Sequence, residues 1–189
     1  MRILSIFGTR PEAIKMAPVI NVLEDTKGID SRVCVTAQHR EMLDSVLKVF
    51  KVRTDHDLNI MQPNQNLAQI TQALLGSIGE ILKEEQPSRV LVHGDTTTTF
   101  IAALAAFYQK IPVGHIEAGL RTGNNYAPFP EEINRKLTDM LCDLHFAPTQ
   151  TAANNLAQEG IDCSGISITG NTVIDALLIA VESIRSNTE

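Results

Sequence analysis

Three acidic residues stand where a carboxylate could move a proton to or from a substrate. Asp95 follows an apolar run and precedes four threonines, and Glu117 ends another apolar run. Glu131 begins a helical pattern directly after a proline. A carboxylate at the end of a buried strand is costly unless it is paired or solvated, which favours a functional role for Glu117.

Each carboxylate also has a simpler interpretation. Asp95 could cap the helix that follows it, and Glu131 could only complement the dipole of its helix. Glu117 could form an ordinary ion pair with Arg121, which contributes little when it is exposed. Residue type and spacing alone leave both interpretations open for all three positions.

Basic residues near the N-terminus could bind an anion. Gly8 ends the first apolar run, and Arg10 and Lys15 follow in a helical pattern. Backbone N–H groups at a helix N-terminus, together with such cations, suit a phosphate group. The segment lacks the glycine-rich signatures of dinucleotide and nucleoside-triphosphate sites. The alternative is a turn closed by a Thr9–Glu12 capping box, with both cations in solvent.

Further polar residues flank these positions. Arg135 lies four residues after Glu131 and shares its helix face, whereas Glu132 should point elsewhere, into solvent. His93 and His115 lie in or beside apolar runs, where a histidine is more often a hydrogen-bonded core residue than a catalyst. We therefore expect Arg135 to position Glu131 and assign no chemistry to the two histidines.

The elements that must position these residues alternate along the whole chain. We expect strands at 3–7, 32–37, 90–92, 111–116, 144–146 and 166–169. We expect helices at 10–23, 40–50, 66–85, 96–109, 130–141, 149–158 and 171–185. This alternation predicts an α/β fold with a doubly wound, mainly parallel, Rossmann-like sheet. Ligands of such sheets bind beyond the carboxyl ends of the strands, where the polar residues above should gather.

Composition excludes several classes of function. The 189 residues suit one large domain, and the net charge of −6 with 4% aromatic residues and no tryptophan argues against a nucleic-acid surface. No apolar run approaches a membrane span, and the N-terminal run lacks the features of a signal peptide. Three scattered cysteines (Cys34, Cys142 and Cys163) and no cluster with ligand spacing argue against a metal site and disulfides. We expect a reduced, cytoplasmic setting.

Six motifs in order resemble one known family. They are FGTRPEAIKMAP at 7–18, TAQHREML at 36–43, HGDTTTT at 93–99, HIEAGLRT at 115–122, PEEINR at 130–135 and ITGNTVIDAL at 168–177. Together they resemble the non-hydrolysing UDP-N-acetylglucosamine 2-epimerases. The resemblance covers essentially the whole chain, and the shared order makes it far more specific than any one motif.

The resemblance implies an architecture and a reaction. The family has two Rossmann-like domains facing a cleft, as in glycosyltransferases of the B type. Residues 1–170 would form the N-terminal domain, and 171–189 a helix leading toward a C-terminal nucleotide-binding domain that lies outside this chain. The reaction interconverts UDP-N-acetylglucosamine and UDP-N-acetylmannosamine by inversion at C2, through elimination and re-addition of UDP, without a cofactor. We expect a homodimer, and we expect the isolated chain to be inactive.

The resemblance also implies roles for residues that match the family motifs. Asp95, Glu117 and Glu131 correspond to its catalytic carboxylates, which share C2 proton transfer and stabilise cationic character at C1. The residues that would bind substrate are Arg10, Lys15 and Arg135, with Arg10 chosen for UDP. Gln38 and His39 match a motif linked to a second, regulatory UDP-sugar site.

Three other functions remain as alternatives. A hydrolysing epimerase would release N-acetylmannosamine and UDP, although the Gln38-His39-Arg40 string favours the non-hydrolysing branch. A truncated, non-catalytic module could bind a UDP-sugar without chemistry. A sugar transferase of the same architecture is less favoured, because it needs an acceptor base rather than three carboxylates.

Overall fold

One parallel sheet organises the chain, and the predicted α/β class is confirmed. The computed structural model describes residues 1–36, 40–60 and 65–186. Seven strands are found in this part, in the order β3-β2-β1-β4-β5-β6-β7, and all neighbours are parallel. They are β1 (Arg2–Phe7), β2 (Asp30–Val35), β3 (His56–Asp57), β4 (Arg89–His93), β5 (Val113–Ile116), β6 (Leu144–Ala147) and β7 (Ile166–Ile168).

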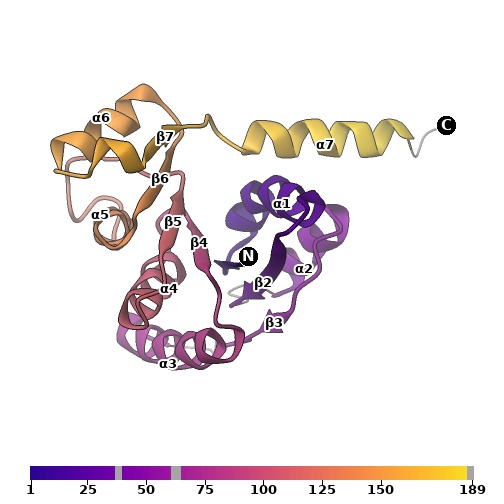
Figure 1. The fold of residues 1–189 in the computed structure, drawn as a ribbon, viewed down its shortest axis with the longest axis horizontal. Helices are drawn as coiled ribbons and strands as arrows, with labels where there is room; N and C mark the ends of the chain where they lie inside the picture. Colours follow the sequence, from indigo (N-terminus) through magenta and orange to yellow (C-terminus); the bar gives the residue numbers. More distant parts are fainter. Residues whose placement is uncertain (37–39, 61–64, 187–189) are drawn as a thin grey trace.

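Helices cover both faces of the sheet. They are α1 (Arg10–Asp25), α2 (Arg40–Val49), α3 (Leu67–Glu85), α4 (Thr97–Tyr108), α5 (Glu131–Leu141), α6 (Gln150–Gln158) and α7 (Val173–Ser186). A 3₁₀ turn at Cys163–Gly165 precedes β7. Figure 1 shows α3, α4, α5 and α6 along one side of the sheet, with α1, α2 and α7 on the other.

Local sequence signals explain where the helices begin. Thr9 and Glu12 form the predicted capping box at the start of α1, with a proline in the first turn. Asn66 and Gln69 form a second capping box at the start of α3. At α4, Thr96 is the N-cap, and its hydroxyl accepts from the backbone N–H of Thr99.

The sheet core follows the alternation of side chains along each strand. Ile3 and Phe7 of β1 face α1 and α2, whereas Leu4 and Ile6 face α3 and α4. All four side chains are buried, and burial of a large apolar side chain contributes about 1.5–3 kcal/mol. These two apolar layers fix the strands, so that their carboxyl ends form a rigid edge.

The order of the strands reverses at β1. This strand pairs with β2 on one side and with β4 on the other, because α3 carries the chain back across the sheet. In this type of fold, ligands bind at the carboxyl edge, in the crevice expected where the strand order reverses. The β1–α1 and β4–α4 junctions therefore line the expected ligand site.

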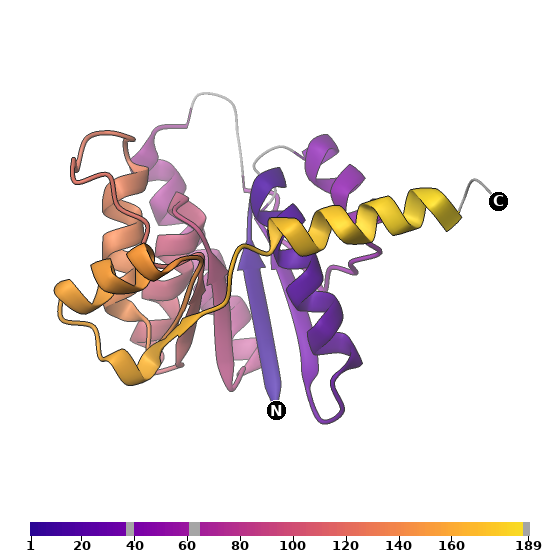
Figure 2. The same cartoon turned by 90° about the horizontal axis from the view of Figure 1, so that it is seen from above.

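Helix α7 crosses back from the end of the sheet to α1. Figure 2 shows it passing alongside α1 and extending beyond it. Ala176 is buried against the α1 side of the core, but other apolar side chains of α7 are exposed. They are Ile174, Leu177, Leu178, Val181 and Ile184.

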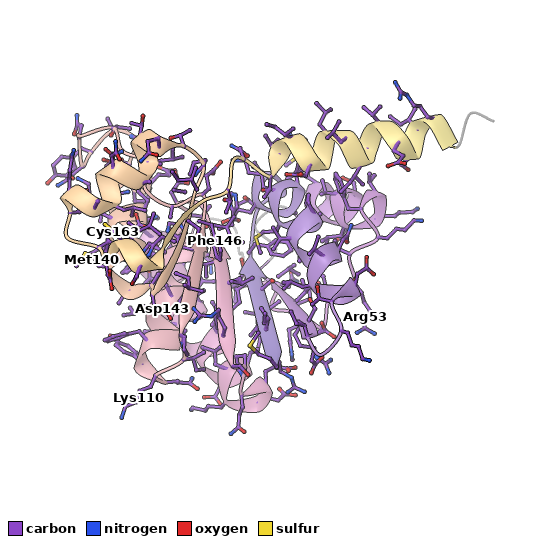
Figure 3. The ribbon with its side chains drawn as sticks, turned by 45° about the horizontal axis from the view of Figure 1, so that its top comes forward. Arg53, Lys110, Met140, Asp143, Phe146 and Cys163 are labelled. Atoms are coloured by element: carbon purple, nitrogen blue, oxygen red, sulfur yellow. The ribbon has the colours of Figure 1, made fainter. Side chains whose placement is uncertain are left out.

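The structure adds one strand to the six that were predicted. Strand β3 has only two residues, too few for a periodic signal, and its His56 ring lies 2.7 Å from the Glu85 carboxylate. The cysteines are free: Cys34 is buried, and exposed Cys163 lies beside β7, across the molecule from Arg53 in Figure 3. Among the described helices, none has the length and apolar character to cross a membrane.

Candidate active site

A buried carboxylate joins the two junctions that line the crevice. Glu12 accepts hydrogen bonds from the backbone N–H groups of Gly8 at 2.9 Å and Thr9 at 2.7 Å. Its other oxygen accepts from the hydroxyls of Thr96 at 2.7 Å and Thr99 at 3.0 Å. Burial raises the pKa of Glu12, and these hydrogen bonds partly offset that effect. The threonines at the start of α4 thus donate hydrogen bonds to the carboxylate that holds the β1–α1 turn.

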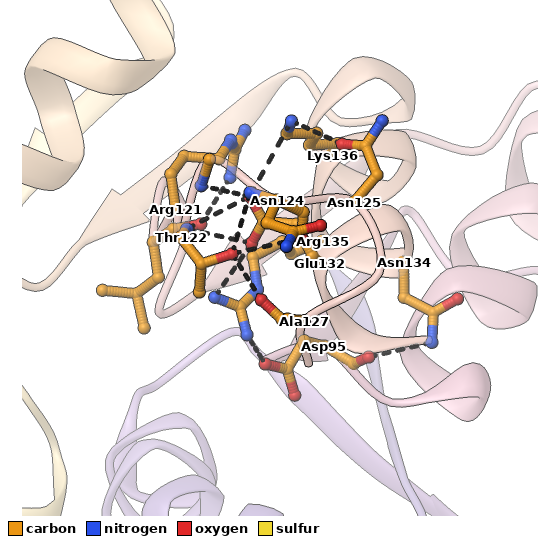
Figure 4. Close-up of polar contacts among 12 residues, drawn as sticks. Asp95, Arg121, Thr122, Asn124, Asn125, Ala127, Glu132, Asn134, Arg135 and Lys136 are labelled. Atoms are coloured by element: carbon orange, nitrogen blue, oxygen red, sulfur yellow. Dashed lines mark hydrogen bonds and ion pairs between the residues drawn. The ribbon is translucent and has the colours of Figure 1, made fainter. Parts of the chain in front are cut away.

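Asp95 is held by α5 and not used as a cap. The N-cap position belongs to Thr96, so the capping interpretation of Asp95 is wrong. The Asp95 carboxylate forms an ion pair with Arg135, and its carbonyl accepts from the Asn134 amide at 3.0 Å (Figure 4). The Asp95 side chain keeps 32% of its surface exposed, whereas Arg135 keeps 10%. A carboxylate is therefore anchored at the site with one side open.

The order of the acidic residues in α5 corrects two expectations. Glu132, expected in solvent, has no exposed surface and accepts from the backbone N–H groups of Thr122 and Gly123 at 3.1 Å. Arg135 lies 3.5 Å from Glu132 and pairs with Asp95. Its described ion pairs do not include Glu131, which it was expected to position. Buried Glu132 anchors the start of the loop that precedes α5.

Glu117 lies at the end of β5 in an unusual backbone conformation. Its φ of +68° is in the left-handed region, which costs a non-glycine residue roughly 1–3 kcal/mol and is typical of functional positions. One carboxylate oxygen accepts from Lys15 Nζ at 2.5 Å and from the Asn171 amide at 3.0 Å. The predicted alternative partner, Arg121, pairs with Asp139 and Glu159. Glu117 is thus held by residues from two separate segments, α1 and the turn that precedes α7.

The two carboxylates occupy neighbouring strand ends. A β-carbon placed on Gly94 would lie 3.9 Å from Glu117 Oε2, so Glu117 lies against the residue that precedes Asp95. Gly94 has a φ of +71°, which glycine adopts without strain, and its N–H donates to Ile116 at 2.9 Å. The β4–α4 turn therefore brings Asp95 and Glu117 to the same part of the edge.

A neutral histidine lies beneath Glu117. His93 is 3% exposed, both of its ring nitrogens lack a hydrogen-bond partner, and Nε2 lies 3.7 Å from Glu117 Oε2. Burial, and then the charges of Lys15 and His115, lower the pKa of His93 to about 3. The sequence suggested a satisfied core histidine, but this ring has unused hydrogen-bonding capacity beside a carboxylate.

The remaining predicted residues have fewer described interactions. Glu131 is the first residue of α5 and is partly exposed, and Arg10 begins α1 with an exposed side chain. Gln38 and His39 lie outside the described residues. The structure thus brings together Lys15 with Glu117 and Arg135 with Asp95, at one edge of the sheet. Two carboxylates with cationic partners suit proton transfer on a substrate that carries negative charge.

A buried charged layer supports this edge and was missed by the sequence reasoning. His115, assigned no chemistry, lies 2.6 Å from Asp139, and Arg121 donates to the other Asp139 oxygen at 2.7 Å. Burial raises the pKa of Asp139, but the charges of His115 and Arg121 outweigh burial and lower it. A sequence signal existed, because Glu132, Arg135 and Asp139 have the spacing of one helix face.

Comparisons with known proteins agree with this geometry. The family model described as UDP-N-acetylglucosamine 2-epimerase matches residues 21–189. The chain is 59% identical to the UDP-N-acetylglucosamine 2-epimerase of Neisseria meningitidis, over 100% of this chain and 50% of that protein. It is 58% identical to the Escherichia coli enzyme of the same name, over 99% of this chain and 50% of that protein.

Solved structures give the same result. The crystal structure of the Neisseria meningitidis UDP-GlcNAc 2-epimerase bound to UDP-GlcNAc matches with a TM-score of 0.96, covering 100% of this chain and 52% of that one. Acinetobacter baumannii MurG, at 15% identity and a TM-score of 0.62, shares the fold alone. The chain spans about half the length of the relatives it matches and corresponds to their N-terminal domain. The chain belongs to the UDP-N-acetylglucosamine 2-epimerase family.

Proposed function

We propose that the protein containing this chain interconverts UDP-N-acetylglucosamine and UDP-N-acetylmannosamine by inverting C2 of the sugar. The C2 proton leaves while the bond from C1 to the UDP oxygen breaks, giving a 2-acetamidoglucal and UDP. Re-addition of UDP to C1 then delivers a proton to the opposite face of C2. The observation that carries the proposal is the adjacency of Asp95 and Glu117 at the crevice, since each face of C2 needs a proton-transfer group.

The proposal assigns a role to each group at the edge. Asp95, Glu117 and Glu131 share the proton transfer at C2 and stabilise positive charge that develops at C1. Arg10 binds the diphosphate, and Lys15 orients Glu117. The contact of Arg135 with Asp95 supports a positioning role there. Gln38 and His39 are proposed for a second, regulatory UDP-sugar site.

Solvent isotope exchange tests the reaction. Incubation of the full-length protein with UDP-N-acetylglucosamine in D₂O should place deuterium at C2 of both epimers. Asp95→Asn, Glu117→Gln and Glu131→Gln should each lower kcat by about 10²–10⁴-fold. The matched control is Glu80→Gln, which removes an exposed carboxylate of α3 and should leave kcat unchanged. Product without deuterium at C2 would refute the reaction scheme. Normal turnover in one carboxylate variant would exclude that residue from the proton transfer.

We propose that residues 1–170 form the N-terminal domain and that 171–189 lead toward a C-terminal nucleotide-binding domain. The apolar side chains that α7 leaves exposed, including Leu177 and Leu178, support this division. The 189-residue chain should then bind UDP weakly by calorimetry and show no epimerisation. Measurable epimerisation by this chain would overturn the proposal that turnover needs the C-terminal domain.

The setting of the protein is also proposed. Free Cys34, Cys142 and Cys163 support a reducing, cytoplasmic compartment. Exposed apolar side chains on α4 and α5, including Phe107 and Met140, support a homodimer, which light scattering tests. The product would serve cell-surface polysaccharide synthesis, so loss of the gene should deplete N-acetylmannosamine from that polymer.

A further inference from the structure

His115 lies between two hydrogen-bond acceptors. The ring has no exposed surface, and its Nδ1 lies 2.6 Å from Asp139 Oδ1. Its Nε2 lies 2.7 Å from the carbonyl oxygen of Gly94. A carbonyl oxygen can only accept, so Nε2 must carry a proton for this contact to be a hydrogen bond.

The surroundings of Asp139 decide where the second proton lies. Arg121 donates to Asp139 Oδ2 at 2.7 Å, and a guanidinium does not lose its proton in proteins. The Asp139 side chain has no exposed surface, and burial is unfavourable for a carboxylate unless cations and donors face it. An ionised Asp139 can accept from Arg121, and it faces a second donor when Nδ1 of His115 also donates to it. The ring then carries protons on both nitrogens.

Other titratable groups near the ring fit this arrangement. His145 of β6 is in register with His115, and its Nε2 donates to the Asp139 carbonyl at 2.8 Å. His93 of β4 is buried, and burial lowers its pKa to about 3, so this ring adds no positive charge beside His115. Among the residues that the structure describes, the remaining charged side chain that contacts the group is Glu159, which pairs with Arg121 at 2.5 Å. The counter-charge to two cations is thus Asp139 with Glu159.

We propose that His115 donates hydrogen bonds from both ring nitrogens and positions Asp95 through the carbonyl of Gly94. The peptide group after Gly94 joins it to Asp95, so a donor fixed on that carbonyl sets the orientation of the turn that presents the carboxylate. Gly94 has a φ of +71° and is held on its other side by its own N–H, which leaves the carbonyl contact to fix the peptide plane. The positioning role rests on the proposed function of Asp95, whereas the protonation state does not.

Side-chain NMR of the ¹⁵N-histidine-labelled 189-residue chain at about pH 7.5 tests the protonation state. His115, assigned by its loss in His115→Gln, should show one attached proton on each ring nitrogen. His93 is an internal reference for a neutral ring, with a single attached proton. Asp139→Asn removes the counter-charge and should remove the second His115 proton, whereas Arg121→Gln removes a competing cation and should leave that proton in place. A wild-type His115 with one protonated nitrogen would overturn the proposal.

Two substitutions separate positioning from simple core filling. Gln can place an amide donor where Nε2 stands, and Asn can place one only where Nδ1 stands. The Gly94 carbonyl and Asp95 amide chemical shifts should stay near wild type in His115→Gln and move in His115→Asn. In the full-length protein, kcat should fall roughly 100-fold in His115→Asn with KM little changed, and His115→Gln should recover most of it. Equal effects of the two variants would reduce His115 to a packing residue, without bearing on the C2 reaction itself.

Discussion

Replacing Glu132 by glutamine should strongly lower the stability of the domain, whereas the same change at the neighbouring Glu131 should leave the stability almost unchanged. The Glu132 carboxylate has no exposed surface and contacts the backbone N–H groups of Thr122 and Gly123 as well as the Arg135 guanidinium. Glutamine keeps one acceptor oxygen but places an NH₂ group where the second oxygen stood. That group meets N–H donors and a cation, so the loss is larger than one hydrogen bond.

The size of the effect follows from these contacts. A hydrogen bond to a charged group contributes about 1.5–3 kcal/mol, and breaking a buried ion pair costs about 3–5 kcal/mol. We expect Glu132→Gln to lower the free energy of unfolding by about 3–5 kcal/mol, out of about 5–15 kcal/mol for a typical domain. Glu131→Gln, at a partly exposed position one residue earlier, should change it by less than about 0.5 kcal/mol.

Urea unfolding followed by far-UV circular dichroism measures both variants, because the chain has no tryptophan for a fluorescence signal. The unfolding midpoint of Glu132→Gln should drop with an unchanged slope. If Glu132→Gln and Glu131→Gln unfold together, the buried carboxylate does not anchor the loop and the reasoning fails.

The pH dependence gives a second check on Glu132. Burial raises the pKa of Glu132, but hydrogen bonds from Thr122 and Gly123 and the charge of Arg135 outweigh burial and lower it. Such a group stabilises the fold above its unfolded pKa of about 4.3 and loses that contribution as pH falls through its folded pKa. The gap between wild type and Glu132→Gln should therefore be full above about pH 5 and shrink below about pH 4.

Three further predictions use the same unfolding assay. Thr99→Val removes a buried hydroxyl that donates to a carboxylate and should cost about 1–3 kcal/mol, whereas Thr97→Val should change little. Equal effects would contradict the role of the threonines. Gly119→Ala combines a φ of +83° with a β-carbon 2.3 Å from a backbone oxygen of α6 and should cost at least about 3 kcal/mol. Gly123→Ala, at a φ of +78° in open space, should lose stability only through backbone strain. A loss of stability as large as that of Gly119→Ala would refute the packing argument. Because burial lowers the pKa of His93 to about 3, stability should fall as pH drops from about 6.5 toward 3, and His93→Gln should flatten this slope. A slope unchanged in the variant would show that another group is responsible.

The sequence was sufficient for the fold because periodicity and capping act locally. The Thr9–Glu12 box and the apolar face of α3 are set by residues a few positions apart, and both were predicted. Strand β3 was missed because its two residues are held by pairing with β2, a contact that local pattern does not encode. A strand of two residues is therefore visible only once the sheet exists.

The site was predicted less completely, for a related reason. The helical pattern of α5 does not indicate which of Glu131 and Glu132 faces the preceding loop, because the loop sequence has no periodicity from which its position could be predicted. Arg135 was matched to the wrong carboxylate, since its partner Asp95 is 40 positions away in the chain. Lys15 and Glu117, 102 positions apart, were each selected from the sequence, but their contact depends on the strand order.

The buried carboxylate of Glu12 has a consequence for how this domain can diverge. It binds two backbone groups of its own turn and two hydroxyls that lie 84 and 87 positions later. Suppose that only one of these two turns were replaced by the matching segment of a relative. Either a buried anion would lose its donors or the two hydroxyls would lose their acceptor, and each change would lower the stability by about 1–3 kcal/mol or more. Chimeras of this domain with distant Rossmann relatives should therefore be tolerated only when both turns come from the same parent.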